Sequence, residues 1–248
     1  MADPFSPDGI QGVLFDLDGT LRYNRPSSTQ AFMDFAVQAG AGDSPEKRLK
    51  LTRWTHYYWA QSPELILDMQ TFGELQDPFW IHYAFRSLLV FECTQEVADK
   101  LAPQVHSHMQ SHTQFDDWVP LDVPETLQEL KEAGFRLGVL SNRSTPCNEH
   151  LEMLGLHKYF KFALVAGEVD SWKPDPKIFQ HALERLETRP QQTVYVGDNY
   201  YADILGAQQA GLHPVLIDPD GIFPEANCPV IRKMGELKEV LVRIHEAG

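Results

Sequence analysis

The chain has few cysteines, and they follow no pattern of a metal site or a disulfide framework. Cys93, Cys147 and Cys228 are the only three among 248 residues, and no Cys-x-x-Cys pair occurs. An odd number of widely spaced cysteines is atypical of a small secreted domain or a zinc site. We therefore expect free thiols in a reducing, cytoplasmic environment.

Long apolar runs are also lacking. Runs such as residues 162–166 cover a handful of positions, whereas a membrane-spanning helix needs about 20. At the start of the sequence, Met1-Ala2-Asp3-Pro4 does not begin a basic region followed by an apolar stretch, so no secretory signal is expected. These patterns predict a chain that neither enters nor binds a membrane.

Positive charge is scarce. Lys and Arg total 21 against 35 Asp and Glu, which gives a formal net charge of −14. Such an acidic surface repels phosphate backbones and anionic lipid, and so it argues against nucleic-acid binding. It does not exclude a small anionic substrate, because a local cation can override the net field.

Short apolar segments alternate with helical patterns in most of the chain. Five segments read as buried strands: residues 12–16, 137–140, 162–166, 193–196 and 214–217. Their apolar residues are continuous rather than alternating, as in strands that are covered on both faces of a parallel sheet. Helical patterns lie between them, at residues 125–133, 147–154, 177–186 and 202–210, and most are followed by glycine. This order predicts an α/β fold with a parallel sheet and helices on both faces.

Residues 22–118 have a different pattern. They show no strand signal and hold three of the five tryptophans, Trp54, Trp59 and Trp80. Helix starts are predicted at Ser27, at Ser44-Pro45, and near residues 78 and 94. We predict a helical domain over residues 22–118, inserted into an α/β domain formed by residues 1–21 and 119–248.

Acidic residues follow two of the predicted strands. The first strand ends in Asp16-Leu17-Asp18-Gly19-Thr20, and the fourth is followed by Gly197-Asp198 and, five residues later, Asp203. Ligands of open α/β sheets bind beyond the carboxyl ends of the strands. If these carboxylates converge, they repel one another and need a cation, and all-oxygen ligands favour Mg²⁺.

Donors of hydrogen bonds follow two further predicted strands, the second and the third. Ser141 and Asn142 come after the second strand, and Lys173 stands in a loop after the third, beside a proline. Ser141 alone is typical of a helix cap, and Lys173 alone is typical of a surface lysine. Together they could hold the oxygens of a phosphoryl group in its transition state.

These motifs resemble those of the haloacid dehalogenase superfamily of hydrolases, in its phosphatase branch with a helical cap. The resemblance covers residues 12–22 and 119–220, where Asp16-Leu17-Asp18-Gly19-Thr20, Ser141-Asn142, Lys173-Pro174 and Gly197-Asp198 through Asp203 stand in the family's order. It implies a Rossmann-like core and an Mg²⁺-dependent phosphatase that acts on a small phosphorylated metabolite through an aspartyl-phosphate. By resemblance, Asp16 is the nucleophile and Asp18 the general acid and base. The implied metal site comprises Asp16, the Asp18 carbonyl, Asp198 and Asp203, and the implied phosphate-binding residues are Ser141, Asn142 and Lys173.

Three alternatives remain open at this point. Dehalogenases of the superfamily displace a halide without a proton donor, and Asp18 argues against that reaction. A sugar-phosphate mutase would keep all four motifs, and a catalytically silent binding module would have lost some of them. The substrate itself is not encoded in these motifs, so we expect residues 22–118 to select it. Arg22 and Arg25 are equally compatible with contacting a second anionic group of the substrate and with lying in a hinge.

Overall fold

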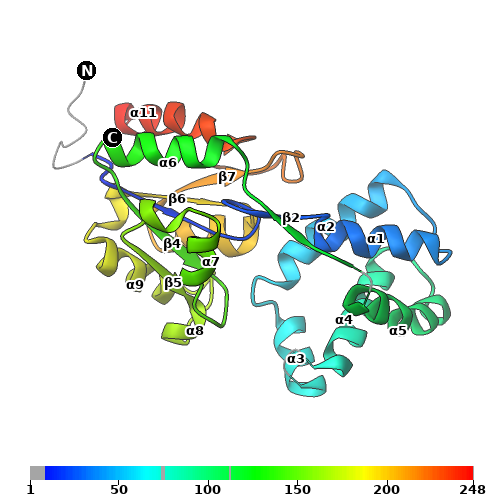
Figure 1. Ribbon diagram of the computed structural model, residues 1–248. Coiled ribbons are helices and arrows are strands. Elements are labelled where there is room, and N and C mark those ends of the chain that lie inside the picture. Colours follow the sequence, from blue (N-terminus) through cyan, green and yellow to red (C-terminus); the bar gives the residue numbers. More distant parts are fainter. Residues whose placement is uncertain (1–8, 74–75, 112, 248) are drawn as a thin grey trace. The chain divides into compact units, whose positions relative to one another are not determined.

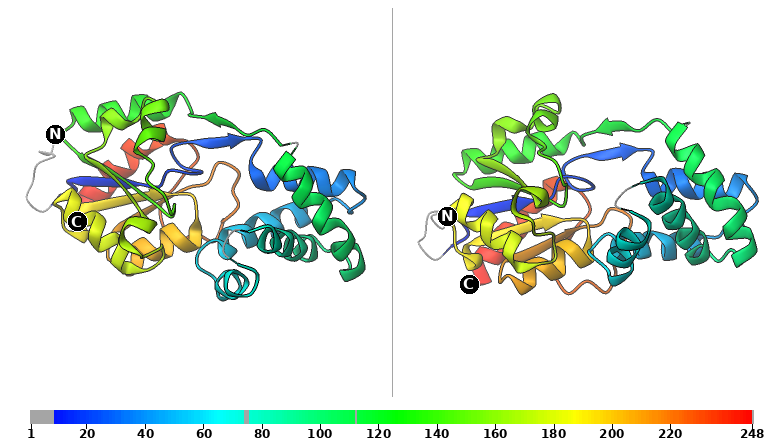
Figure 2. Two further views of the ribbon diagram at one scale, coloured as in Figure 1. Left: turned by 60° about the horizontal axis from the view of Figure 1, so that its bottom comes forward. Right: turned by 90° about the horizontal axis from the view of Figure 1, so that it is seen from below.

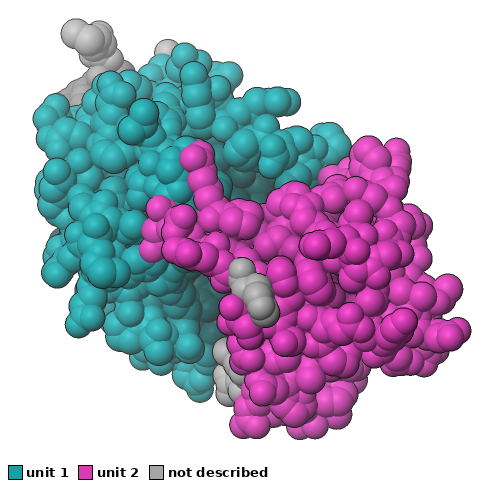
Figure 3. Space-filling view, turned by 45° about the vertical axis from the view of Figure 1, so that its right-hand side comes forward, with its two compact units in different colours: residues 1–23, 118–248 teal, residues 24–117 magenta. Residues whose placement is uncertain are grey.

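The chain divides into two compact units in the computed structural model, which describes residues 9–73, 76–111 and 113–247 (Figures 1 and 3). Unit 1 comprises residues 1–23 and 118–248, and unit 2 comprises residues 24–117. At the two crossings between the units, strands β2 (Tyr23–Arg25) and β3 (Asp116–Trp118) pair with each other. The sequence analysis missed this pair, because three-residue strands are too short to show an alternating pattern.

Unit 1 is built on a parallel sheet of six strands in the order β5-β4-β1-β6-β7-β8. This confirms the predicted α/β fold. The strands are β1 (Gly12–Phe15), β4 (Arg136–Ser141), β5 (Phe162–Val165), β6 (Thr193–Gly197), β7 (His213–Ile217) and β8 (Val230–Ile231). Five of them were predicted from the sequence, and no strand was predicted at β8. Strand β1 is central, with Leu14 opposite Gly138 on one side and Tyr195 on the other.

Helices cover both faces of this sheet (Figures 1 and 2). Val13 and Phe15 pack on the face covered by α6, α7 and α11, whereas Leu14 packs on the face covered by α9 and α10. Successive residues of β1 thus enter different cores, which explains its continuous apolar sequence. The helices of unit 1 are α6 (Asp122–Glu132), α7 (Asn148–Met153), α8 (Ala166–Val169), α9 (Pro176–Leu186), α10 (Leu205–Gln209) and α11 (Leu237–Ala247), with short turns η1 (His157–Tyr159), η2 (Pro190–Gln192), η3 (Tyr200–Ile204) and η4 (Met234–Glu236).

Unit 2 is helical, with an apolar core of its own. Its helices are α1 (Ser28–Gln38), α2 (Pro45–Tyr58), α3 (Pro63–Phe72), α4 (Asp77–Val90) and α5 (Gln95–Ser111). The Ser27 and Ser44 hydroxyls accept hydrogen bonds from backbone N–H groups in the first turns of α1 and α2, as their sequence positions predicted. The sequence analysis missed α3. The aromatic rings of Trp54, Tyr58, Trp59, Trp80 and Tyr83 pack against one another, with Tyr58 buried and the other four half-buried.

No helix within the described ranges is both long enough and apolar enough to span a membrane.

Candidate active site

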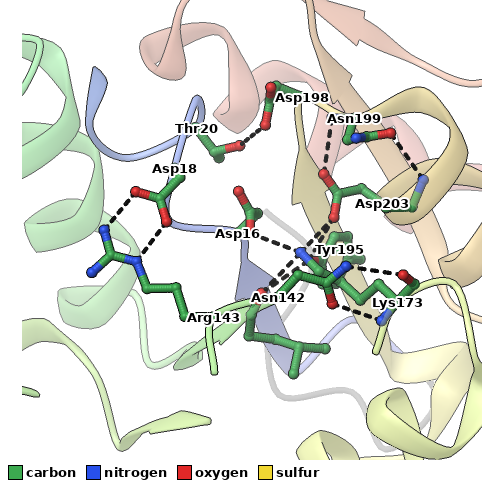
Figure 4. Close-up of polar contacts among 12 residues, drawn as sticks. Asp16, Asp18, Thr20, Asn142, Arg143, Lys173, Tyr195, Asp198, Asn199 and Asp203 are labelled. Atoms are coloured by element: carbon green, nitrogen blue, oxygen red, sulfur yellow. Dashed lines mark hydrogen bonds and ion pairs between the residues drawn. The ribbon is translucent and has the colours of Figure 1, made fainter. Parts of the chain in front are cut away.

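The candidate site lies at the carboxyl ends of three adjacent strands of unit 1 (Figure 4). Asp16 follows β1, Asn142 follows β4, and Asp198 follows β6. Because β1 pairs with both β4 and β6 in parallel, the three strand ends meet at one edge of the sheet. Lys173 comes from the loop before α9, a helix that begins at Pro176 with Asp175 as its capping residue.

Lys173 is the central cation of this site, although its side chain is only 2% exposed. Its Nζ lies 2.7 Å from Asp16 Oδ1, 2.6 Å from Asp203 Oδ1 and 2.8 Å from the hydroxyl of Tyr195. The three N–H groups of an ammonium match these three oxygens. Lys173 thereby joins the end of β1 to the residues of β6 and η3.

Asn142 holds the backbone of Lys173. Its amide donates to the Lys173 carbonyl at 2.9 Å and accepts from the Lys173 N–H at 2.7 Å. Its oxygen and nitrogen therefore fix the position of the lysine, a role that the sequence analysis did not assign. The predicted contact of Asn142 with phosphate stays a prediction, as does that of Ser141, which is buried at the end of β4.

Three carboxylates gather beside Lys173. One oxygen each from Asp16, Asp198 and Asp203 lies within 4.8 Å of the others. Burial raises the pKa of Asp16 to about 7, with Lys173 acting in the opposite direction. Burial also raises the pKa of Asp198 well above its ordinary range, and the charges of Asp16 and Asp203 raise it further.

This cluster has the composition of a magnesium site. Three carboxyl groups gather beside one ammonium, all of the candidate ligand atoms are oxygens, and a divalent cation would stabilise the ionised form of such carboxyl groups. The Asp203 oxygens also accept hydrogen bonds from the Tyr195 hydroxyl at 3.0 Å and from the Asn199 N–H at 2.9 Å. Both oxygens of that carboxylate therefore already have hydrogen-bond donors within the protein. Asp16 and Asp198 therefore have more oxygen atoms available for a metal ion than Asp203 has.

Gly19 allows the chain to turn beside Asp198. Its φ is +91°, and a Cβ atom there would lie 2.4 Å from Asp198 Oδ2. Only glycine meets both demands, because a side chain would be strained and would collide with the carboxylate. The Thr20 hydroxyl donates to Asp198 Oδ1 at 3.2 Å. The segment after β1 therefore shapes the acidic cluster from two sides.

The Asp18 side chain points away from the cluster and toward Arg143 (Figure 4). Arg143 donates to both of its oxygens, at 2.7 and 2.6 Å, and Arg22 Nε lies 2.8 Å from Oδ1. Burial alone would raise the pKa of Asp18, but the hydrogen bonds and charge of Arg143 and the charge of Arg22 outweigh it and hold that pKa below its ordinary value. The metal contact expected of Asp18 was through its carbonyl, and it stays a prediction.

Arg22 and Arg25, for which a substrate contact and a place in a hinge were both left open, lie in different places. Arg22 pairs with Asp18, so the structure gives it a partner within the protein. Arg25 ends β2 in unit 2 and is exposed. Sequence reasoning missed Arg143 and Tyr195. Arg143 could have been identified from its position directly after Ser141-Asn142. Tyr195 lies within an apolar strand, and no feature of the sequence marks it as part of the site.

Known hydrolases resemble this chain in sequence. The family model for haloacid dehalogenase-like hydrolases matches residues 10–211. A glyceraldehyde 3-phosphate phosphatase of Methanothermobacter thermautotrophicus is 37% identical over 47% of this chain and 55% of its own. A ribulose-1,5-bisphosphate 5-phosphatase of Halopiger xanaduensis is 32% identical over 84% of both chains. The chain spans about half the length of several curated relatives that it matches.

A solved structure provides a further likeness. The 2-haloacid dehalogenase of Pseudomonas syringae pv. Tomato DC3000 has a TM-score of 0.54 and 28% identity, over 94% of this chain and 99% of its own. Similarity therefore extends to phosphatases and to a dehalogenase, so the choice between the two reactions rests on the residues of the site.

Proposed function

The chain belongs to the haloacid dehalogenase-like hydrolases, and we propose that it is a phosphatase that hydrolyses a small phosphate monoester in the presence of Mg²⁺. The observation that carries this proposal is the group of Asp16, Asp198 and Asp203 beside the buried Lys173, with Asp18 two residues after Asp16. A carboxylate nucleophile, an ammonium and a neighbouring acid are what transfer of a phosphoryl group to the protein requires. Curated relatives named as phosphatases support the same reaction class.

In the first step, an Asp16 oxygen attacks phosphorus and the bond to the leaving oxygen breaks. That oxygen takes up a proton and leaves as an alcohol; we assign the proton to Asp18, which is ionised while Arg143 holds it and must therefore take up a proton before this step. Lys173 holds Asp16 Oδ1 at 2.7 Å, which leaves the other carboxylate oxygen for the attack. A magnesium ion bound at Asp16 and Asp198 would neutralise charge on the phosphoryl oxygens.

In the second step, water attacks the phosphorus of the aspartyl-phosphate. Asp18, now ionised, takes a proton from that water, and the bond between phosphorus and the Asp16 oxygen breaks. Inorganic phosphate leaves, and Asp16 is restored as a carboxylate. Two moderate barriers thus replace the single very high barrier of uncatalysed monoester hydrolysis.

Dehalogenation is the second candidate, favoured by the likeness to a 2-haloacid dehalogenase. A halide needs no proton when it leaves, so that reaction gives Asp18 no task. The acidic cluster likewise suits a phosphoryl group with a metal better than a carbon–halogen bond. Both observations favour the phosphatase.

The deciding experiment measures release of phosphate and of halide by the purified chain. The panel contains three- to five-carbon sugar phosphates, phosphorylated acids, nucleotides and 2-chloropropionate, with and without Mg²⁺. We expect phosphate from at least one ester, only with Mg²⁺, and no halide. Asp16→Asn should abolish release, whereas Asp220→Asn, a change at an exposed loop residue, should not. Halide release, or phosphate release that survives Asp16→Asn, would contradict the proposal.

A further inference from the structure

Tyr23 stands where the turn after β1 leads into β2. The Arg22 carbonyl accepts a hydrogen bond from the Gly19 N–H at 2.8 Å, and the Arg22 N–H donates to the Leu17 carbonyl at 3.0 Å. Gly19 in turn lies against the carboxylate of Asp198, where an added Cβ would come within 2.4 Å of Oδ2. The folded turn therefore brings the next residue, Tyr23, to the margin of the acidic cluster.

The ring of Tyr23 is held by packing. Its centroid lies 5.6 Å from that of Trp118, with an angle of 48° between the ring planes. Tyr23 begins β2 and Trp118 ends β3, and these two strands pair with each other. Both residues belong to unit 1, and both are half-buried. The ring therefore has a fixed place that does not depend on its hydroxyl group.

The hydroxyl group of Tyr23 has no hydrogen-bond partner among the described residues. The hydroxyl of a buried tyrosine ordinarily has one. Burial raises the pKa of this phenol, and the charges of Asp198 and Asp122 raise it further, so the group keeps its proton and remains a donor. A donor on a fixed ring thus lies beside the carboxyl groups proposed for the reaction, and it is available to another molecule.

The surroundings of this donor favour one kind of acceptor. A substrate hydroxyl can accept a hydrogen bond from Tyr23 and donate its own proton to a neighbouring carboxylate. A substrate carboxylate could accept from Tyr23, but it would face the negative charges of Asp198 and Asp122. An alkyl chain would leave the phenol without a partner in the complex, which costs free energy. Of the three groups, the hydroxyl fits both the donor and its charged neighbours.

We propose that Tyr23 is a specificity-determining residue that donates a hydrogen bond to a hydroxyl group of the leaving alcohol. The inference rests on the proposed phosphatase reaction, and it narrows the substrates to phosphorylated polyols and sugars. In this role Tyr23 contacts the leaving group and not the phosphoryl group. Its removal should therefore affect esters according to their hydroxyl groups and leave the reaction of a plain alkyl phosphate unchanged.

Two pairs of esters test this role, because the members of each pair differ in their hydroxyl groups. The first pair is sn-glycerol 3-phosphate and propyl phosphate, and the second is ribose 5-phosphate and pentyl phosphate. The wild type should prefer the hydroxylated member of a pair. Tyr23→Phe removes the hydroxyl and keeps the ring. In the pair that the wild type cleaves faster, we expect this variant to lower kcat/KM about fivefold to tenfold for the hydroxylated ester and less than about twofold for the plain ester.

Tyr159→Phe is the matched control. Tyr159 lies in η1, shortly before the start of β5, and so at the opposite edge of the sheet from the site. Its replacement should change kcat/KM for none of the esters. Thermal unfolding is the second measurement, and Tyr23→Phe should unfold at the same temperature as the wild type, because the removed hydroxyl has no partner among the described residues.

Equal decreases for both members of a pair would overturn the proposal, because they would place the effect at the phosphoryl group or in the fold. A wild type that prefers the plain esters would overturn it as well, and so would an unchanged kcat/KM of Tyr23→Phe for the hydroxylated ester. In each of these cases, cleavage of any ester by the wild type still supports the phosphatase. A wild type that cleaves no phosphate ester contradicts the phosphatase itself, and this inference with it.

Discussion

Replacing Lys173 with methionine would remove the one ammonium among the buried carboxylates of unit 1 while keeping a side chain of similar length. Its Nζ lies 2.7 Å from Asp16 Oδ1 and 2.6 Å from Asp203 Oδ1. At an effective dielectric of 20, each contact corresponds to about 6 kcal/mol of attraction. Much of this attraction offsets the free-energy cost of removing the three charged groups from water. Removing one partner of such a group typically costs about 3–5 kcal/mol, and we expect a loss of that size at pH 8.

The penalty should depend on pH, with a sign set by Asp16. Burial raises its pKa from 3.8 to about 7 even though Lys173 opposes the rise, so loss of Lys173 raises it further. When the pKa of a carboxyl is higher in the folded state than in the unfolded state, the free energy of unfolding falls as the pH rises above the unfolded-state pKa. It stops falling only when the pH has passed the folded-state pKa. In the variant this loss continues to a higher pH than in the wild type. At pH 5 the pH is below the folded-state pKa of Asp16 in both proteins. Asp16 is therefore protonated in both, and it contributes no difference in stability between them.

Urea unfolding at pH 5 and pH 8 tests this reasoning. Hydrogen exchange of the β1 and β6 amides assigns the change to unit 1. Lys161→Met is the control, because Lys161 forms an exposed pair with Glu187 at 2.8 Å and should cost less than about 1 kcal/mol at either pH. A Lys173→Met penalty that is the same at both pH values, or as small as the control, would refute the electrostatic account.

Four further predictions follow from the same site. Asp16→Asn should reduce phosphate release by at least about a thousandfold with no loss of thermal stability, because it removes one buried charge without opening a cavity; retained turnover would place the nucleophile elsewhere. Chelation should abolish activity, and added Mg²⁺ should raise the free energy of unfolding more at pH 8 than at pH 5, because Asp16 is protonated below its pKa of about 7; full activity without metal would contradict this. Gly19→Ala should cost about 1–3 kcal/mol and weaken Mg²⁺ binding in calorimetry, since its Cβ would meet Asp198 at 2.4 Å; unchanged affinity would count against the proposed ligand. Tyr195→Phe should cost about 1–3 kcal/mol in urea unfolding, because it leaves Lys173 without one of its buried partners; an unchanged midpoint would show that the hydroxyl is dispensable.

Much of the fold could be predicted because burial on both faces leaves a clear mark in the sequence. The run Val13-Leu14-Phe15 is apolar at every position because its residues enter two different cores. Strand β8 (Val230–Ile231) has two residues, which is too few to show a pattern. Helix α3 was missed because Leu65, Ile66 and Leu67 form a continuous run, which lacks helical spacing.

The predictability of the site follows a different rule. Asp16 and Asp198 could be assigned because each stands where an apolar strand ends, a position that is visible in the sequence. The partners of Asp18 could not be assigned, because Arg143 comes from a distant segment and reaches it only after β1 and β4 have paired. Tyr195 is likewise a core residue by pattern, and its hydroxyl acquires a role only where it meets Lys173.

The central position of β1 has a consequence for the order in which the chain is synthesised. Gly12 pairs with Arg136 and Thr193, so β1 leaves the ribosome long before either neighbour exists. At about 5–20 residues per second, its second partner follows on the order of ten seconds or more later. In that interval β1 is an unpaired apolar strand, the kind of segment from which aggregation begins. Its four residues are fewer than the six or seven of a typical aggregating segment, and Asp16 and Asp18 follow at once with negative charge. The carboxylates proposed for the chemistry are therefore also expected to oppose aggregation of the newly synthesised strand, because charge next to an apolar segment disfavours its association with other chains.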